Sequence, residues 1–149
     1  MCELLIFCVH SPLYYGIYKD KKLDSTYTLS EKTSRALLQL YTHTKKEYKI
    51  QNIYYANGPG NLSTLKLLHT FLHTWALIED IGLFAADSFT LMPNAPIYAF
   101  GNKYFVKNDE KIEFVALDMT PQCAFLFPQI LNPALFDKKP EPFYVLPAI

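Results

Sequence analysis

The chain has 149 residues, of which half are hydrophobic and 15% aromatic, and its 14 basic and 14 acidic residues cancel. This length predicts one domain with an adequate core, and the apolar content predicts surface reserved for a partner. The balanced charge argues against a protein that grips nucleic acid alone. Three cysteines without a C-x-x-C pair fit a reducing cytoplasm and exclude a disulfide framework or zinc ribbon.

Membrane and secretory signals are also missing from the sequence. No apolar run has the length needed to span a bilayer. The first residues, Met-Cys-Glu-Leu-Leu-Ile-Phe, lack the basic start of a secretory signal and predict a strand instead. We therefore expect a cytoplasmic protein that makes no membrane contact.

The first third of the chain predicts three strands and a helix. Residues 4–10 form a continuous apolar run, which is typical of a central strand. The runs 13–18 and 23–29 follow so closely that the three strands predict an antiparallel meander. Ser30 then predicts the N-cap of a helix over 31–46.

The next segment predicts a strand, a turn and a long helix. An apolar strand is expected over 51–56, a helix from about 61 to 80, and a further short strand over 83–86. The helix carries two apolar stripes, so it has two sides to bury. One side can cover the sheet, and the other needs a neighbouring helix or a second protein. The stripes are Leu62, Leu65, Leu68, Leu72 and Ala76, and Leu67, Phe71, Trp75 and Ile78.

The rest of the chain is rich in proline and predicts only short strands. Runs at 97–100, 103–107 and 112–117 predict a small antiparallel meander, irregular chain follows, and 143–146 predicts a last strand. The expected fold is α/β, with a mixed five-stranded sheet (the meander plus two parallel strands), two main helices and a reduced second subdomain. The corresponding division is 1–90 for the first domain and 91–149 for a truncated C-terminal subdomain.

The turn Gly58-Pro59-Gly60 precedes the second helix, where outward-pointing amides can cradle an anion. Gly58 and Gly60 are therefore the candidates for a cofactor site. The turn matches neither common nucleotide-binding loop, and Lys66 comes too late for a phosphate-loop lysine. We interpret it as a turn that sets the angle between strand and helix, with Asn61 or Ser63 as cap, and we expect no cofactor.

Other polar residues give no catalytic or metal site. His69 and His73 share one helix face, which is metal-capable geometry, but a third ligand at a suitable spacing is missing. Asp87-Ser88 and Asp118 follow strands, where they fit a catalytic role or an N-cap or turn equally well. No nucleophile elbow or spaced carboxylate pair is present. We expect neither a bound metal nor a catalytic residue.

Several segments together resemble the TsaB (YeaZ) family. The strand 53–56, the loop Asn-Gly-Pro-Gly-Asn-Leu-Ser-Thr-Leu-Lys at 57–66 and the segment 81–89 are similar to that family's strand, Gly-Pro-Gly-Ser-Phe-Thr-Gly-Leu-Arg loop and following strand. Residues 33–38 and the closing Pro-Phe-Tyr-Val-Leu at 142–146 also match. The match covers residues 4–90 and extends loosely over 95–149.

This resemblance implies the actin-like (ASKHA) fold of the actin, sugar-kinase and Hsp70 superfamily. It also implies a catalytically silent partner of the TsaD enzyme. With the ATPase TsaE, TsaD places a threonylcarbamoyl group on the adenosine beside the tRNA anticodon (t6A), so tRNA is met only through the complex. The chain departs from the family in having Val9-His10-Ser11 for Asp-Thr-Ser, in its loop residues and in its shorter length.

The resemblance and the two-sided helix together predict a partner interface on the two main helices. Its predicted residues are Leu37, Leu38, Tyr41, Leu67, Phe71 and Trp75. A homodimeric module that buries the same helices is one alternative. A small ATPase or kinase of the same superfamily is another, which would need an acid near the first strand and a second phosphate loop.

Overall fold

The computed structural model describes residues 2–119 and 125–145, which form two sheets. The larger sheet has the order β3-β2-β1-β4-β5. β1 to β3 are an antiparallel meander, and β4 and β5 run parallel to β1. The predicted mixed sheet is confirmed. Its strands are β1 Cys2–Phe7, β2 Leu13–Lys19, β3 Lys22–Leu29, β4 Ile50–Ala56 and β5 Gly82–Ala86.

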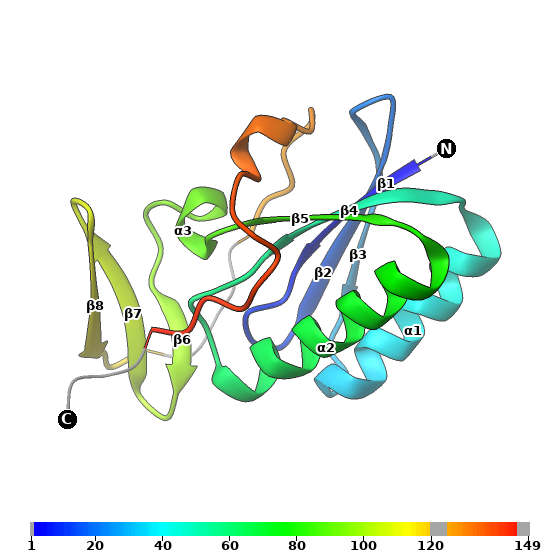
Figure 1. The fold of residues 1–149 in the computed structure, drawn as a ribbon. Helices are drawn as coiled ribbons and strands as arrows, with labels where there is room; N and C mark the ends of the chain where they lie inside the picture. Colours follow the sequence, from blue (N-terminus) through cyan, green and yellow to red (C-terminus); the bar gives the residue numbers. More distant parts are fainter. Residues whose placement is uncertain (1, 120–124, 146–149) are drawn as a thin grey trace.

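Two long helices, α1 Thr33–Glu47 and α2 Leu62–Glu79, lie side by side on one face of this sheet (Figure 1). The prediction that Ser30 caps α1 is wrong. The cap is Lys32, in extended backbone and without a side-chain cap bond, because two further residues carry the chain from the edge strand to the helical layer. Asn61 does cap α2, since its side chain accepts a hydrogen bond from the Thr64 amide.

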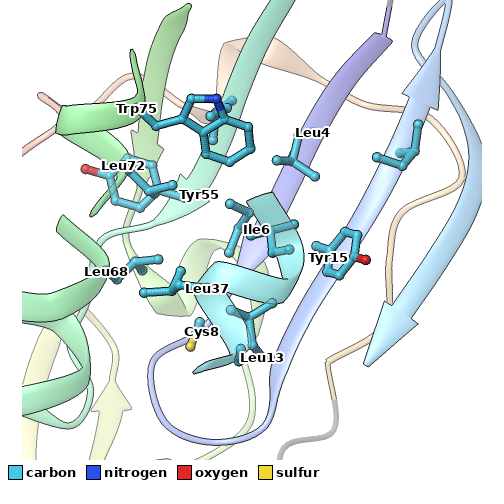
Figure 2. Packing of buried hydrophobic residues seen from close by; sticks show 14 of the residues in the cluster. Leu4, Ile6, Cys8, Leu13, Tyr15, Leu37, Tyr55, Leu68, Leu72 and Trp75 are labelled. Carbon is cyan, nitrogen blue, oxygen red and sulfur yellow. The ribbon is translucent and has the colours of Figure 1, made fainter. Parts of the chain in front are cut away.

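The core under the helices is built from alternate strand residues and one stripe of each helix (Figure 2). From β1, Leu4 and Ile6 point toward the helices, as the two-residue period of a strand requires. Leu37 and Leu40 of α1 meet them, and α2 contributes one face. That face consists of Leu68, Leu72 and Trp75, all buried.

The opposite face of the sheet is covered by shorter elements and irregular chain. The smaller sheet has the order β6-β7-β8, and the segment 125–136 packs beside it in a second apolar cluster. Phe125 stacks on Phe7 at a ring-centroid distance of 4.5 Å, and the Tyr18 hydroxyl donates to the Pro128 carbonyl at 2.6 Å. The elements are α3 Ser88–Leu91, β6 Ile97–Phe100, β7 Lys103–Asn108, β8 Lys111–Ala116 and the 3-10 turn η1 Pro133–Leu135.

Three further details differ from the predicted elements. β1 ends at Phe7, although the apolar run continues buried to residue 10. Residues 143–145 form no strand, because the chain there makes a single ladder-like bond from the Phe143 amide to the Asn57 carbonyl at 2.8 Å. Residue 146, the expected end of that strand, lies outside the described residues. The short helix α3 was not predicted, although its cap Asp87 fits the N-cap interpretation.

None of the helices in the described part of the chain combines the length and apolarity needed to cross a bilayer.

Candidate functional site

An apolar groove of about 370 Å³ lies between the outer sides of α1 and α2. We call it the α1–α2 groove. Its largest side chains are aromatic or aliphatic, and its polar residues stand at the margin. The residues that line it are Leu38, Tyr41, Leu67, Thr70, Phe71, Thr74, Trp75, Ile78 and Glu79.

Helical spacing explains how α2 supplies both the core and the groove. Leu67, Phe71 and Trp75 are four residues apart, so they follow one another along the helix. Leu68 and Leu72 lie one position further round and face the sheet. Trp75 stands at the boundary, because it belongs to the buried core and also lines the groove. The second apolar stripe of α2 is therefore only partly covered within the described residues, because Trp75 is buried while Leu67 and Ile78 remain exposed.

Three aromatic rings form the floor of the groove. Tyr41 of α1 meets Trp75 edge-on at 5.1 Å and Phe71 at 6.2 Å, and Phe71 and Trp75 are themselves 6.2 Å apart. Edge-to-face packing of this kind favours one arrangement of the rings. The floor is thus pre-formed by contacts between the two helices.

A charged pair closes one end of the groove. Lys45 donates to the Tyr41 hydroxyl at 2.8 Å and lies 3.5 Å from the Glu79 carboxylate. The hydrogen bond to Tyr41, followed by the charge of Glu79, raises the pKa of Lys45. The pair ties the C-terminal halves of α1 and α2 together at the margin of the apolar surface.

Aliphatic side chains at the edges of the groove remain in water. Leu38 is 59% exposed, Leu67 39% and Ile78 73%. Burial of one such side chain stabilises an interface by about 1.5–3 kcal/mol, and contiguous exposed apolar surface of this kind marks interaction sites. The groove therefore has the chemistry of a surface for a partner helix or loop.

The predicted interface residues can now be placed. Five of the six, Leu38, Tyr41, Leu67, Phe71 and Trp75, come together at the groove. Leu37 does not, because its side chain points into the core and is only 1% exposed. Its neighbour Leu38 takes the outward position, since successive helical residues are about 100° apart.

Ile78, Thr70 and Thr74 also line the groove but were missing from the predicted interface. Ile78 lies on the second apolar stripe predicted for this helix, but the sequence alone does not show that its side chain is exposed. The two threonines lie three residues after Leu67 and Phe71, which is a helical spacing on the same side. Spacing could therefore have found all three.

The turn Gly58-Pro59-Gly60 is engaged by the chain itself. A Cβ on Gly60 would come within 2.5 Å of the Val9 carbonyl oxygen, and one on Gly58 within 2.2 Å of the Phe143 oxygen. Gly58 also has a φ of +129°, which favours glycine. Both glycines permit close packing of backbone on backbone, which supports the interpretation of a structural corner.

The loop after β1 carries no acidic residue, and its residues are hydrogen-bonded to the chain around them. The Asn61 amide donates to the Val9 carbonyl at 2.7 Å, and His10 is buried with its Nδ1 2.7 Å from the Ser11 carbonyl. Burial lowers the pKa of His10, although the bond to Ser11 opposes the shift. The described residues of this corner therefore bond one another.

The rings of His69 and His73 are tilted by 50° to each other, with their centroids 4.1 Å apart. Within residues 2–119 and 125–145, no three His, Cys, Asp or Glu side chains are arranged to hold a metal ion. The Nε2 of His73 hydrogen-bonds the Pro140 carbonyl. The pair therefore faces the C-terminal segment of the chain.

Solved structures with the same arrangement identify the fold. The chain resembles YeaZ from Pseudomonas aeruginosa with a TM-score of 0.58 and 9% sequence identity, over 78% of this chain and 65% of that one. This is the YeaZ fold. A second structure, described as an uncharacterized protein with similarity to peptidase YEAZ from Pseudomonas aeruginosa, gives the same score, identity and coverage of this chain.

The YeaZ resemblance seen in the sequence is thus confirmed at the level of the fold. The chain spans 65% and 64% of the lengths of these two structures. No protein-family model and no curated protein sequence matches the chain. The fold is therefore established by structure, and the activity has to be argued from the site.

Proposed function

We propose that this protein is a non-catalytic scaffold of the TsaB kind, which binds a TsaD-like partner through the α1–α2 groove. In that role it would support tRNA threonylcarbamoyladenosine (t6A) formation together with TsaE, and it would meet tRNA only through the complex. The observation that carries the proposal is the partly exposed apolar groove between α1 and α2 in a chain with the YeaZ fold.

The composition of the groove supports binding of another protein. Tyr41 is partly exposed and belongs to a residue type that contributes strongly to binding energy at the centre of an interface, and the buried Trp75 supports its ring. Around them, Leu38, Leu67 and Ile78 supply apolar area that water now covers. Lys45 and Glu79 give the margin one charge of each sign, which favours a definite orientation of the partner.

The proposal gives the chain no chemical step. The corner at Gly58 and Gly60 packs closely against Val9 and Phe143, and the cavity of about 250 Å³ beside Gly60 is lined mainly by apolar side chains of β6 to β8 and by Asn61 and Ser63. Val9 and His10 stand where a superfamily enzyme would need an acid. Tight ATP binding in calorimetry would overturn this part of the proposal and favour the ATPase or kinase alternative.

Co-purification of tagged protein with a TsaD homologue tests the groove directly. Leu67→Asp or Phe71→Asp should reduce complex formation at least about tenfold, because a carboxylate would be desolvated at the interface. Leu77→Asp is the matched control. Leu77 lies on the same helix and is 84% exposed, but it is not among the residues that line the groove, so binding should persist.

Retained binding by both groove variants, with normal circular dichroism, would contradict the assigned surface. Loss of binding in the Leu77 control as well would also contradict it. Depletion of the protein should lower t6A in tRNA, and unchanged t6A would remove the assigned pathway.

A homodimer that buries the same groove is the alternative occupant. The paired Lys45 and Glu79 at the margin could be exchanged between two copies related by a two-fold axis. Light scattering with and without the TsaD homologue separates the two. A stable dimer that the homologue does not dissociate would favour the homodimeric module.

A further inference from the structure

The segment 138–143 crosses the carboxyl ends of β5 and β4 as a narrow strap, drawn in red in Figure 1. Three backbone groups hold it. The Lys138 amide donates to the Ala85 carbonyl at 3.0 Å, and the Phe143 amide donates to the Asn57 carbonyl at 2.8 Å. The Asn57 side-chain amide donates to the Glu141 carbonyl at 2.8 Å.

The side chains of this strap contribute little packing. Most of them are exposed, namely those of residues 138, 139, 141 and 143, as are those of the flanking residues 137 and 144. Phe136, just before the strap, is the last buried residue along the described chain. Segments with few apolar contacts and solvent-exposed hydrogen bonds open at low free-energy cost. The strap is therefore attached mainly by the hydrogen bonds described above and by His73, which bonds the Pro140 carbonyl.

Beside the strap, three buried polar atoms have no hydrogen-bond partner among residues 2–119 and 125–145. They are the Tyr55 hydroxyl, Asn57 Oδ1 and His69 Nδ1, and Tyr55 and Asn57 are only 1% and 6% exposed. A buried polar group without a partner lowers the stability of the arrangement that buries it. This cost is present while the strap lies in place, and it is relieved when water reaches the three atoms.

His69 connects this cost to protonation. A proton added at Nδ1 would place a charged donor in a site where that atom has no acceptor. Burial, and next the neighbouring His73, lower the pKa of His69, while the Glu141 charge opposes the shift. The other groups nearby are Tyr55 on β4, whose pKa is raised by burial and then by Glu141, and Lys66, three residues earlier on α2.

We propose that residues 138–143 form a proton-sensitive lid, which opens when His69 takes up a proton and which His73 ties down through Pro140. The lid covers the carboxyl ends of β4 and β5, the side of a parallel sheet where open α/β folds bind ligands. The Phe143 carbonyl lies so close to Gly58 that a Cβ there would meet it at 2.2 Å. Opening uncovers this corner. The inference does not depend on the α1–α2 groove.

The direction of the pH effect follows from linkage. The closed lid disfavours the proton on His69, so the open state binds more protons and gains population as pH falls. For one proton, the opening constant rises about tenfold per pH unit between the ordinary histidine pKa, about 6.5, and the lower value in the closed state. Above that range the lid stays closed.

Hydrogen exchange of the wild-type protein tests the lid without any substitution. Between about pH 7.5 and about pH 5.5, we expect the protection of the Lys138 and Phe143 amides, corrected for intrinsic exchange, to fall by up to about tenfold, which is the limit for one proton. Amides of β1 should keep their protection. Unchanged strap amides, or strap and β1 amides that lose protection together, would overturn the proposal.

Two histidine variants separate the trigger from the tie. His69→Gln should abolish the pH dependence of strap exchange, and His73→Gln should speed exchange at both pH values. His43→Gln, on α1 and remote from the strap, is the matched control and should behave as wild type. Persistent pH dependence in His69→Gln would overturn the assignment. Should that variant fail to fold, an NMR titration of the wild-type His69 ring decides, because its titration must coincide with strap opening.

Discussion

The two faces of the five-stranded sheet are covered in different ways. On one face, α1 and α2 form a regular layer whose contact with the sheet is mainly apolar, with one hydrogen bond between Tyr15 of β2 and His43 of α1. On the other, short strands, α3 and the irregular segment 125–136 fill the space. Each helix packs one side on the sheet and turns its other side outward, and here the outward sides of α1 and α2 form the apolar groove between them. The irregular segment 125–136 is fitted to the one surface that it covers, and we call this segment the seal.

The difference between the two faces is tested most directly by truncating one large residue on each face. Leu72→Ala, under α2, should lower the free energy of unfolding by about 2–5 kcal/mol, and Phe125→Ala, in the seal, by about 3–5 kcal/mol. Leu72 is fully buried, and Phe125 is 6% exposed and stacked on Phe7. Urea unfolding measures both. A cost below about 1 kcal/mol for Phe125→Ala alone would mean that the segment is an appendage and not part of the core.

A smaller effect is expected at Gly16, where the seal packs closely on the sheet. A Cβ on Gly16 of β2 would come within 2.8 Å of the Phe127 ring and 3.3 Å of Leu23. Gly16→Ala should therefore displace Phe127 and cost about 1–3 kcal/mol. Phe127→Ala should suppress this cost in a double-mutant cycle of unfolding free energies. Additive effects of the two substitutions would contradict the close contact.

The smallest predicted effect depends on pH and distinguishes the faces by polarity. Glu3, beside the residues of the seal, accepts hydrogen bonds from Lys21, Asn52 and Tyr54. Burial would raise the pKa of Glu3, but these three bonds outweigh it and hold the pKa below the usual 4.5. Its contribution to stability is therefore present above about pH 4.5 and is lost as pH falls through the lower folded value.

Urea unfolding at about pH 7 and about pH 3 tests this sign. Wild type should lose more stability between the two pH values than Glu3→Gln, whose side chain does not titrate. All other carboxyl groups are shared by the two proteins, so the difference isolates Glu3. An equal loss in both proteins would show that the carboxylate adds no pH-dependent stability.

How far the sequence predicts the structure also differs between the two faces. The strands and helices of the helix-covered half were predicted at nearly their observed positions, because periods of 2 and 3.6 residues are repeated over long segments. The errors there are local. The sequence predicts Ser30 as the cap of α1, whereas the cap is Lys32, and it predicts both Leu37 and Leu38 at the interface, whereas Leu37 is buried and only Leu38 points outward.

The seal was harder to predict for a physical reason. Its contacts join residues more than a hundred positions apart, such as Tyr18 and Pro128, and no short window records them. The His73 bond to Pro140 is of the same kind. The sequence also gives no signal for the strap that the histidine pair faces.

The distance between Tyr18 and Pro128 along the chain also has a consequence for synthesis. The ribosome makes the strands and both long helices before it makes residues 125–136, so the helix-covered face can close while the other face still awaits its cover. Until then Phe7 and its neighbours form an apolar sheet surface that is exposed to water. Contacts of such high sequence separation also slow folding. The nascent protein should therefore depend on chaperones during the last part of its translation.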